Sequence, residues 1–210
     1  MVKKVLLGIL VLLVVVIGGF VAAVAMQPNE FSVTRSTVIE APPEVVHAQV
    51  NDFHSWPAWS PWEKLDPNME RTLSEPAAGE GAVYEWKGND EVGHGKMTIL
   101  ESKPGELVKI KLDFYKPMED TSTVDFRFEP QDGGTKVEWA MAGESNIMFK
   151  AMCLFMDMDA MIGGQFEQGL AEMKKVAEAE AGGGPASGDP AGGTGEPEPE
   201  TGEGGAEAGS

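Results

Sequence analysis

The chain is poor in the residues that cross-link small proteins or bind metals. It has one cysteine, Cys153, and three histidines in 210 residues. A single cysteine forms no intramolecular disulfide, and no Cys/His cluster has the spacing of a structural zinc site. The sequence also lacks a nucleophile elbow, a phosphate-binding loop and metal-ligand spacing. We therefore predict no metal, no cofactor and no assignable catalytic residue.

Basic residues are scarce as well. The chain carries 16 Lys and Arg against 34 Asp and Glu, a formal net charge of -18 at pH 7. Proteins that bind nucleic acid present a basic face to the phosphates. The acidic balance therefore argues against a nucleic-acid partner, although much of the acidity lies near the C-terminal end.

What the chain does contain is a long apolar run near its start. Residues 5–25 carry no charge, and ~20 apolar residues cross a hydrocarbon core of ~30 Å as a helix. The small-residue sequence Ala23-Val24-Ala25 would also suit cleavage of a signal peptide, but signal cores usually run only ~7–15 residues. We favour an uncleaved transmembrane anchor over residues 1–26.

The charges around this run predict its orientation. Lys3 and Lys4 precede it, whereas the first charges after it are Glu30 and Arg35. Positive residues are retained on the cytoplasmic side. We expect a single-pass protein of the cytoplasmic membrane, with its N-terminus inside and its domain on the periplasmic or extracellular face.

The other end of the chain has the composition of a tail. Residues 181–210 contain no aromatic, branched aliphatic or basic side chain, only Gly, Pro, Ala, small polar residues and acids. Such a segment buries too little apolar surface to offset the loss of chain entropy. We predict a disordered acidic tail here, and one folded domain over residues 31–180.

Within that domain, apolar and polar residues alternate with a period of two. Residues 31–39 predict a first strand, and residues 41–53 a short helix with two prolines in its first turn. The alternation then predicts an antiparallel meander with one wet face and one apolar face. Its segments are residues 81–89, 95–100, 106–117, 122–130 and 135–143.

Residues 147–180 change to helical spacing, with apolar side chains every three or four residues. They predict one long amphipathic helix that covers the apolar face of the sheet. Its first half is apolar nearly all round, so several neighbours wrap it, or it borders a cavity, a membrane or a partner. Gly163 and Gly164 indicate a kink or a close approach within it.

Four blocks of sequence carry a family likeness. They are VTRSTVIEAPPEVVHAQVNDFHSWPAWSPW, GEGAVYEWKGNDEVGHGKMTI, GGTKVEWAM and FEQGLAEMKK, spread over residues 31–178. They resemble the SRPBCC or START-like superfamily, in particular its bacterial polyketide cyclase/dehydrase-like proteins. The resemblance implies an α+β helix-grip fold, in which a curved antiparallel sheet wraps around a long C-terminal helix. It also implies an apolar cavity between them for lipids, sterols, polyketides or similar molecules.

The predicted function is that of a membrane-anchored binding domain for a hydrophobic or amphipathic small molecule, lipid- or polyketide-like. This superfamily shares a cavity and not a reaction, so two alternatives stay open, as does the oligomeric state. One is a polyketide cyclase or dehydratase-like enzyme with Tyr84 and His54 as its leading polar groups. The other is a protein-interaction module of the chaperone-activator type, presenting the Trp-rich loop and the Met-rich half of the last helix.

We expect the ligand to contact inward-facing aromatic and Met side chains, with Tyr84 as the best polar handle. Three tryptophans lie in the loop HSWPAWSPW, residues 54–62, where core packing and lining of the cavity mouth both stay open. Arg35 either binds an anionic group of the ligand or, as we favour, is a charge on an edge strand or part of a structural ion pair. The predicted ligand-binding residues are Trp56, Trp59, Trp62, Tyr84, Trp86, Phe114, Phe126, Trp139, Met152 and Met156.

Overall fold

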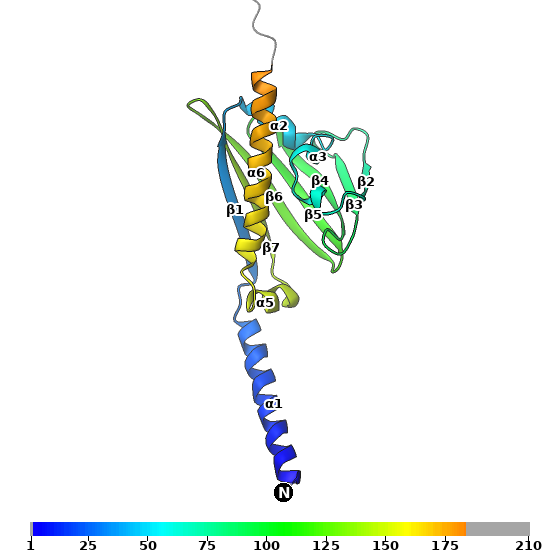
Figure 1. Cartoon of the computed structure of the whole chain (residues 1–210), viewed down its shortest axis with the longest axis vertical. Coiled ribbons are helices and arrows are strands. Elements are labelled where there is room, and N and C mark those ends of the chain that lie inside the picture. Colours follow the sequence, from blue (N-terminus) through cyan, green and yellow to red (C-terminus); the bar gives the residue numbers. More distant parts are fainter. Residues whose placement is uncertain (1, 184–210) are drawn as a thin grey trace, which may run out of the picture.

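A seven-stranded antiparallel sheet curves around the C-terminal helix in the computed structural model, which describes residues 2–183 (Figure 1). The strands lie in the order β1-β7-β6-β5-β4-β3-β2, so the first strand pairs with the last. This arrangement confirms the helix-grip fold. The strands are β1 (Glu30–Ile39), β2 (Glu70–Leu73), β3 (Val83–Lys87), β4 (His94–Lys103), β5 (Leu107–Lys116), β6 (Asp120–Gln131) and β7 (Gly134–Glu144).

The helices divide between the concave face of the sheet and the chain start. α6 crosses the concave face, α2 to α4 lie beside its upper part, and α1 projects from the opposite end of the domain (Figure 1). α1 is long and apolar enough to cross a membrane, and its apolar stretch is not buried against the domain, as in a membrane span or a signal sequence. The helices are α1 (Val2–Ala25), α2 (Pro43–Asn51), α3 (Trp56–Trp59), α4 (Trp62–Leu65), α5 (Ile147–Cys153) and α6 (Met158–Gly182).

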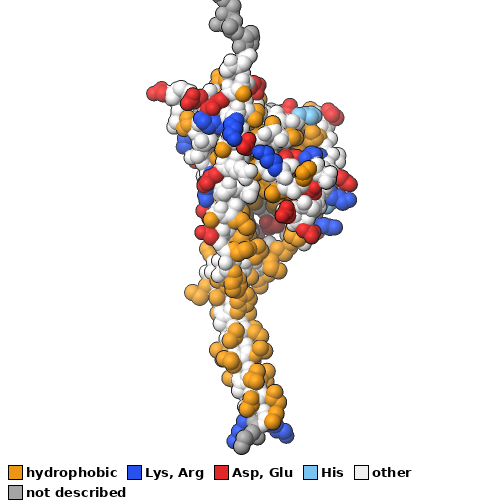
Figure 2. Space-filling model, in the orientation of Figure 1, with side chains coloured by type: hydrophobic (Ala, Val, Ile, Leu, Met, Phe, Trp, Pro, Cys, Tyr) orange, Lys and Arg blue, Asp and Glu red, His pale blue; other side chains and the backbone are white. Residues whose placement is uncertain are grey.

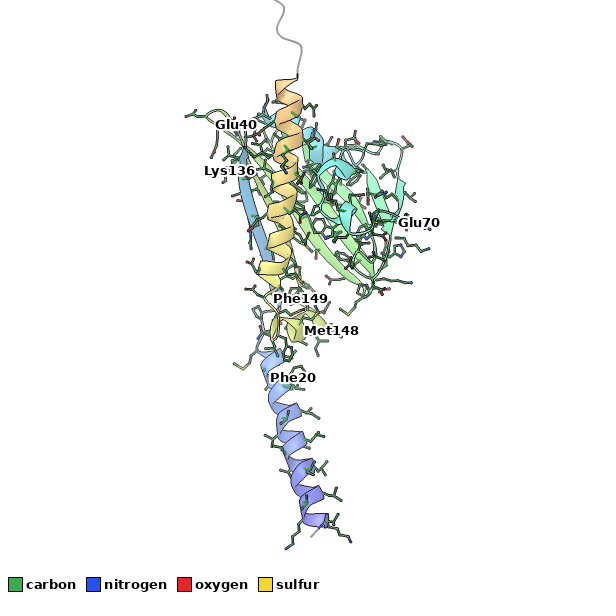
Figure 3. All side chains as sticks on the ribbon, in the orientation of Figure 1. Phe20, Glu40, Glu70, Lys136, Met148 and Phe149 are labelled. Atoms are coloured by element: carbon green, nitrogen blue, oxygen red, sulfur yellow. The ribbon has the colours of Figure 1, made fainter. Side chains whose placement is uncertain are left out.

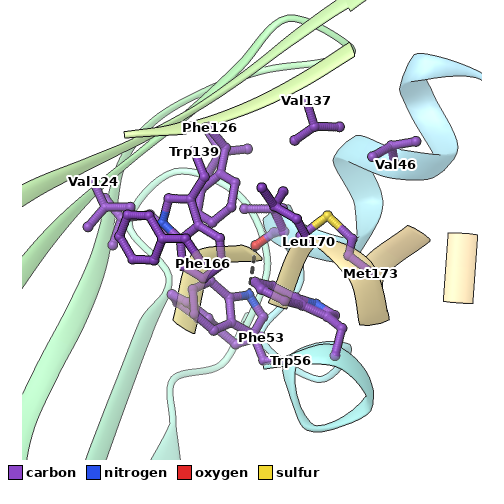
Figure 4. Packing of buried hydrophobic residues seen from close by; sticks show 14 of the residues in the cluster. Val46, Phe53, Trp56, Val124, Phe126, Val137, Trp139, Phe166, Leu170 and Met173 are labelled. Atoms are coloured by element: carbon purple, nitrogen blue, oxygen red, sulfur yellow. Dashed lines mark hydrogen bonds between the residues drawn. The ribbon is translucent and has the colours of Figure 1, made fainter. Parts of the chain in front are cut away.

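The period-two pattern forms strands because each strand has one side against the helices and one side in water. In β6, Val124, Phe126 and Phe128 are buried, whereas Thr123 before them and Arg127 between the two phenylalanines are exposed. The same alternation runs through β7 and the first half of β5, and ladder partners such as Phe126 and Trp139 therefore share the concave face. The buried residues of this face and of α6 form a single cluster (Figure 4).

The prediction of one continuous helix over residues 147–180 is wrong, because two helices meet at a break. Asn146 caps α5 by accepting a hydrogen bond from the Phe149 N–H at 2.8 Å, and Asp157 caps α6 through the Ala160 N–H at 3.0 Å. A capping side chain stabilises a new helix start by satisfying otherwise unpaired N–H groups. The apolar spacing runs through the break and conceals it.

Two other parts of the chain bear on the sequence predictions: the segment before β3 and the C-terminal tail. The stretch from Trp56 to Leu73 forms two single-turn helices and the edge strand β2, none of which the sequence pattern predicts. α6 ends at Gly182, and the remainder of the predicted disordered tail lies outside the described residues.

Candidate functional site

Aromatic side chains fill the space between the concave face and α6. Trp139 of β7 stacks on Phe166 of α6 with ring centroids 4.2 Å apart, and Phe126 lies 4.7 Å from Trp139. All three rings are buried, and Figure 4 shows them grouped beneath α6. Ring separations of this size leave no room for a ligand between the rings, since protein interiors pack at the density of organic crystals.

The three tryptophans of the loop have two different roles. Trp56 and Trp59 are buried, and their indole N–H groups donate to the backbone oxygens of Val50 at 3.0 Å and Gln49 at 2.9 Å. These bonds tie the loop to the end of α2. Trp62 is only half-buried and meets Trp139 edge-on at 5.7 Å. Trp62 is therefore the loop tryptophan that borders solvent beside the core.

A polar trio lies at the β2–β3 edge of the same face. Tyr84 donates its hydroxyl proton to Glu63 Oε1 at 2.5 Å, and Arg71 donates from Nε to Glu63 Oε2 at 2.6 Å. Tyr84 is 3% exposed and Glu63 is 9% exposed. Burial, and then the hydrogen bond to Glu63, raise the pKa of Tyr84 well above its ordinary value. The Tyr84 hydroxyl is therefore a proton donor and stays protonated at neutral pH.

Two further polar groups of the concave face are buried without a hydrogen-bond partner among the described residues. They are the indole N–H of Trp139 and the hydroxyl of Ser122. Ser122 adjoins the ring of Phe31 across Gly143, since a side-chain carbon at Gly143 would touch both groups. A buried polar group without a partner costs free energy, so such groups are available to bind a polar atom of a ligand.

An open hollow of about 510 Å³ lies where the concave face ends near α1. That volume falls within the range of ~300–1,000 Å³ that is usual for small-molecule sites. Its walls are mostly apolar and come from the start of β1, from α5 and from the break before α6. The lining residues are Phe31, Ser32, Val33, Phe149, Cys153, Leu154, Phe155, Met156, Asp157, Met158 and Asp159.

The carboxylate side of this hollow is fixed by two ion pairs of one arginine. Arg35 donates to Asp159 at 2.9 Å and to Glu167 at 2.8 Å, which joins β1 to α6. The hydrogen bond from Arg35 keeps the pKa of Asp159 below its ordinary value. Arg35 thus takes part in structural ion pairs, one of the two roles that we favour from the sequence. A second hollow of about 440 Å³, beside Thr37 and Lys174, has a more charged lining.

The sequence model of one protein family, described as "Polyketide cyclase / dehydrase and lipid transport", matches residues 30–178. This match covers most of the chain. The chain belongs to the polyketide cyclase / dehydrase and lipid transport family. No curated protein matches its sequence at a significant level.

Solved structures share the fold of this family member at low sequence identity. Protein CV1439 from Chromobacterium violaceum is 18% identical with a TM-score of 0.52, and the match covers 72% of this chain and 99% of CV1439. The Aha1 dimer from Colwellia psychrerythraea is 15% identical with a TM-score of 0.51, and the match covers 70% of this chain and 96% of the Aha1 chain. The di-domain ARO/CYC StfQ of the steffimycin pathway gives 11% and 0.56, and the match covers 73% of this chain and 52% of StfQ.

The structure of this polyketide cyclase / dehydrase family member sorts the predicted site residues into three groups. Eight aromatic residues form one chain of ring contacts in which Phe53 links Tyr84 to Trp56, and Trp62 and Phe114 are half-buried within it. Met156 lies at the break between α5 and α6 and lines the hollow, and Met152 lies on α5 outside the buried cluster. The eight aromatic residues are Trp56, Trp59, Trp62, Tyr84, Trp86, Phe114, Phe126 and Trp139.

The polar groups divide in a similar way. His54 is not part of the interior: its side chain is 62% exposed and pairs with Asp52 at 2.8 Å. Glu63 and Arg71 complete the Tyr84 site, and the sequence pattern offers no signal for either, because Glu63 lies in a short helix that periodicity does not detect. Among the described residues, no group of three or more His, Cys, Asp or Glu side chains is arranged to hold a metal ion.

Proposed function

We propose that this protein is a membrane-anchored binding domain for a hydrophobic or amphipathic small molecule, lipid- or polyketide-like. The observation that carries the proposal is the hollow of about 510 Å³ at the α1 end of the concave face. Its apolar walls suit an acyl chain or a ring system, whose burial contributes ~25 cal/mol per Å². Membership of a family described by cyclase, dehydrase and lipid-transport activity supports the same class of ligand.

The polar groups beside the hollow suit an amphipathic ligand. Ser122 has an unpaired buried hydroxyl next to Phe31, which lines the hollow. A carbonyl or hydroxyl oxygen of the ligand would satisfy this donor. Asp157 and Asp159 give the rim a negative charge that Arg35 offsets in part. We therefore expect a ligand with a neutral polar group rather than a strongly acidic one.

A cyclase or dehydratase-like enzyme is the second candidate, and the buried trio favours it. Tyr84 holds its proton beside the ionised pair of Glu63 and Arg71. A phenol carries a single proton, so Tyr84 would have to exchange its hydrogen bond to Glu63 for one to a substrate carbonyl oxygen before it acts as an acid. If this candidate is right, the protein turns over a substrate, and Tyr84→Phe abolishes the turnover but still retains the ligand. Unchanged turnover in that variant would exclude Tyr84 as the acid.

The binding proposal is tested by what the full-length chain retains. The protein is expressed in a bacterial host, transferred to nanodiscs of one synthetic lipid, and extracted with organic solvent for mass spectrometry. We expect a bound hydrophobic compound other than the nanodisc lipid, in a fixed ratio to protein. Val33→Phe, which adds volume to the hollow wall, should lower its retention about ten-fold, equivalent to ~1.4 kcal/mol.

The matched control is Val38→Phe, since Val38 lies on the same strand but is 42% exposed, whereas Val33 is 3% exposed. Circular dichroism of both variants establishes that they fold. Equal retention by Val33→Phe and Val38→Phe would locate any ligand outside the hollow. A wild-type chain that never carries such a compound, and takes none up from a lipid extract, would contradict the binding function itself.

A further inference from the structure

Exposed apolar side chains gather at one end of the domain, around α5. Figure 2 shows them as a hydrophobic zone that joins the domain to α1. Large apolar residues so exposed and so close together usually mark an interaction surface. We call this set the α5 patch. Its members are Ile147 (77% exposed), Met148 (52%), Phe155 (79%), Met156 (44%) and Met161 (49%).

The rest of the domain surface has no comparable group among the described residues. Its other exposed large apolar side chains are each 46% exposed or less, and only Tyr115 and Met118 are close in sequence; the others are Val38, Leu65 and Leu100. Residues 147–156 contain a single charged residue, Lys150, whose ammonium group donates to Asn29 in the α1–β1 connection. The α5 patch is therefore an uncharged surface on a strongly acidic protein. Single exposed apolar residues are common on protein surfaces, but they do not explain a gathered group of this kind.

The α5 patch is continuous with the apolar surface of α1. α5 packs against α1, and Phe20 of α1 stacks on Phe155 with ring centroids 6.2 Å apart. Val24, in the last turn of α1, is 5% exposed. Figure 3 shows Phe20 directly beneath Phe149 and Met148. Only residues Met26–Asn29 separate α1 from β1, at up to ~3.5 Å each, so the contact keeps the α5 patch beside the end of the apolar helix.

We propose that the α5 patch inserts into the lipid leaflet on the domain's side of the membrane, next to α1. The inference rests on the anchoring role of α1 in the proposed function. Segments with exposed Phe and aliphatic side chains lie ~5–10 Å into the headgroup and acyl boundary. Phe149, Phe155 and Met156 also line the 510 Å³ hollow, so insertion opens the hollow onto lipid, and an apolar ligand enters it without crossing water.

The distribution of charge favours a bilayer over a second copy of the chain. Lys150 lies beside the α1–β1 connection, where a lysine reaches the headgroups while its stem stays in the apolar layer. The acidic residues Asp157 and Asp159 lie between Met156 and Met161 at the start of α6, where Arg35 of β1 pairs with Asp159. The apolar side chains of the α5 patch thus adjoin one lysine beside the α1–β1 connection and carboxylates that an arginine offsets in part, a composition that suits a membrane interface.

The test measures the depth of single positions in nanodiscs. Full-length protein with Cys153→Ser receives Phe155→Cys, Leu13→Cys or Asp132→Cys, and each variant carries an NBD fluorophore. Nanodiscs contain phosphatidylcholine with a nitroxide placed either shallow or deep in the acyl chain. We expect position 155 to lose most of its emission to the shallow nitroxide and position 13 to the deep one. Position 132, in the β6–β7 turn, should lose none.

Each other result has a definite reading. Quenching at position 13 without quenching at position 155 overturns the insertion of the α5 patch and leaves the anchor intact. No quenching at position 13 contradicts the anchor of the proposed function. A blue-shifted emission at position 155 that neither nitroxide quenches shows a protein contact, such as a second copy, and also overturns the proposal. Ile147→Cys repeats the measurement at a second exposed position, in case the loss of Phe155 alters the stack with Phe20.

Discussion

Tyr84 illustrates how burial and one carboxylate determine the behaviour of a side chain. Its ring packs against Phe53 and Trp86, and its hydroxyl donates to Glu63, which also binds Arg71. The buried environment disfavours a phenolate, and the negative charge of Glu63 disfavours it further. The positive charge of Arg71 balances the negative charge of Glu63. The trio therefore holds one protonated phenol, Tyr84, among apolar side chains.

Tyr84→Phe should change how stability depends on pH. The folded state holds the Tyr84 proton above the unfolded pKa of ~10. The contribution of this proton to the free energy of unfolding is therefore full below about pH 10 and falls as the pH rises. The fall approaches ~1.4 kcal/mol per pH unit until the raised pKa is reached. The variant lacks this slope, and it loses ~1 kcal/mol at neutral pH for the missing hydrogen bond. Denaturant unfolding between about pH 9 and pH 11 measures both effects.

The quantity compared at each pH is the difference in the free energy of unfolding between the wild type and Tyr84→Phe, because the effect of the lysines is the same in both proteins and cancels. Tyr115→Phe is the matched control, since Tyr115 is 39% exposed. If Tyr84→Phe and the wild type show parallel curves over this pH range, the Tyr84 proton is not held by folding. The trio would then be a flexible surface group rather than a buried donor.

The alternation of residues predicts the inward direction of Tyr84 and Trp139, because a strand has a strict period of two. It does not predict what each inward group meets. Glu63 reaches Tyr84 from a helix of four residues, and Trp62 adjoins Phe166 from the other end of the chain. Contacts of this kind depend on how a loop folds over the sheet. The packed aromatic interior therefore appears only in the structure, whereas the identity of its members is predicted from the sequence.

At the scale of elements, the division between α5 and α6 separates two functions of one apolar stretch. α6 buries Phe166, Leu170 and Met173 against the sheet, whereas α5 has no fully buried residue. The amphipathic spacing of residues 147–180 predicts helix correctly in both parts. The turn between them ends at Asp157, whose side chain caps the start of α6, and this cap is a local signal within an otherwise continuous pattern.

The adjacent glycines of α6 provide a prediction at this scale. A side-chain carbon at Gly163 would fall on the guanidinium group of Arg35, whereas one at Gly164 would meet open space. Gly164→Ala should stabilise the chain by ~1 kcal/mol through helix propensity. Gly163→Ala gains the same propensity but displaces Arg35 from Asp159 and Glu167, so we expect no net gain. Urea unfolding of both variants in the same detergent measures the difference.

Arg35→Gln combined with each glycine variant provides the control. Without the guanidinium group, both alanines should stabilise to a similar degree, because the steric conflict is gone. Equal stabilisation by both alanines in the wild-type background would mean that Arg35 moves away at no cost. The sequence indicates a kink or a close approach at this pair, and the structure shows the close approach at Gly163.

For the whole molecule, the apolar surface is concentrated on α1 and on the adjoining end of the domain (Figure 2). Residues 5–25 are uncharged, the α5 patch follows in space, and charged side chains cover the rest of the domain (Figure 2). The helix-grip fold follows from the sequence because strand and helix periods differ. The location of the hollow does not, because it arises where the break before α6 leaves space next to β1. The periodicity of apolar residues in the sequence indicates neither the break nor this space.

This polarity predicts the topology of the full chain. Lys3 and Lys4 should keep the N-terminus in the cytoplasm, and the domain should lie on the other side. In a Cys153→Ser background, Asp132→Cys should react with a membrane-impermeant maleimide in intact bacterial spheroplasts. Val2→Cys, on α1, should react only after lysis. Labelling of position 2 in intact spheroplasts would reverse the topology, and an intact mass that lacks residues 1–25 would identify α1 as a cleaved signal sequence instead of an anchor.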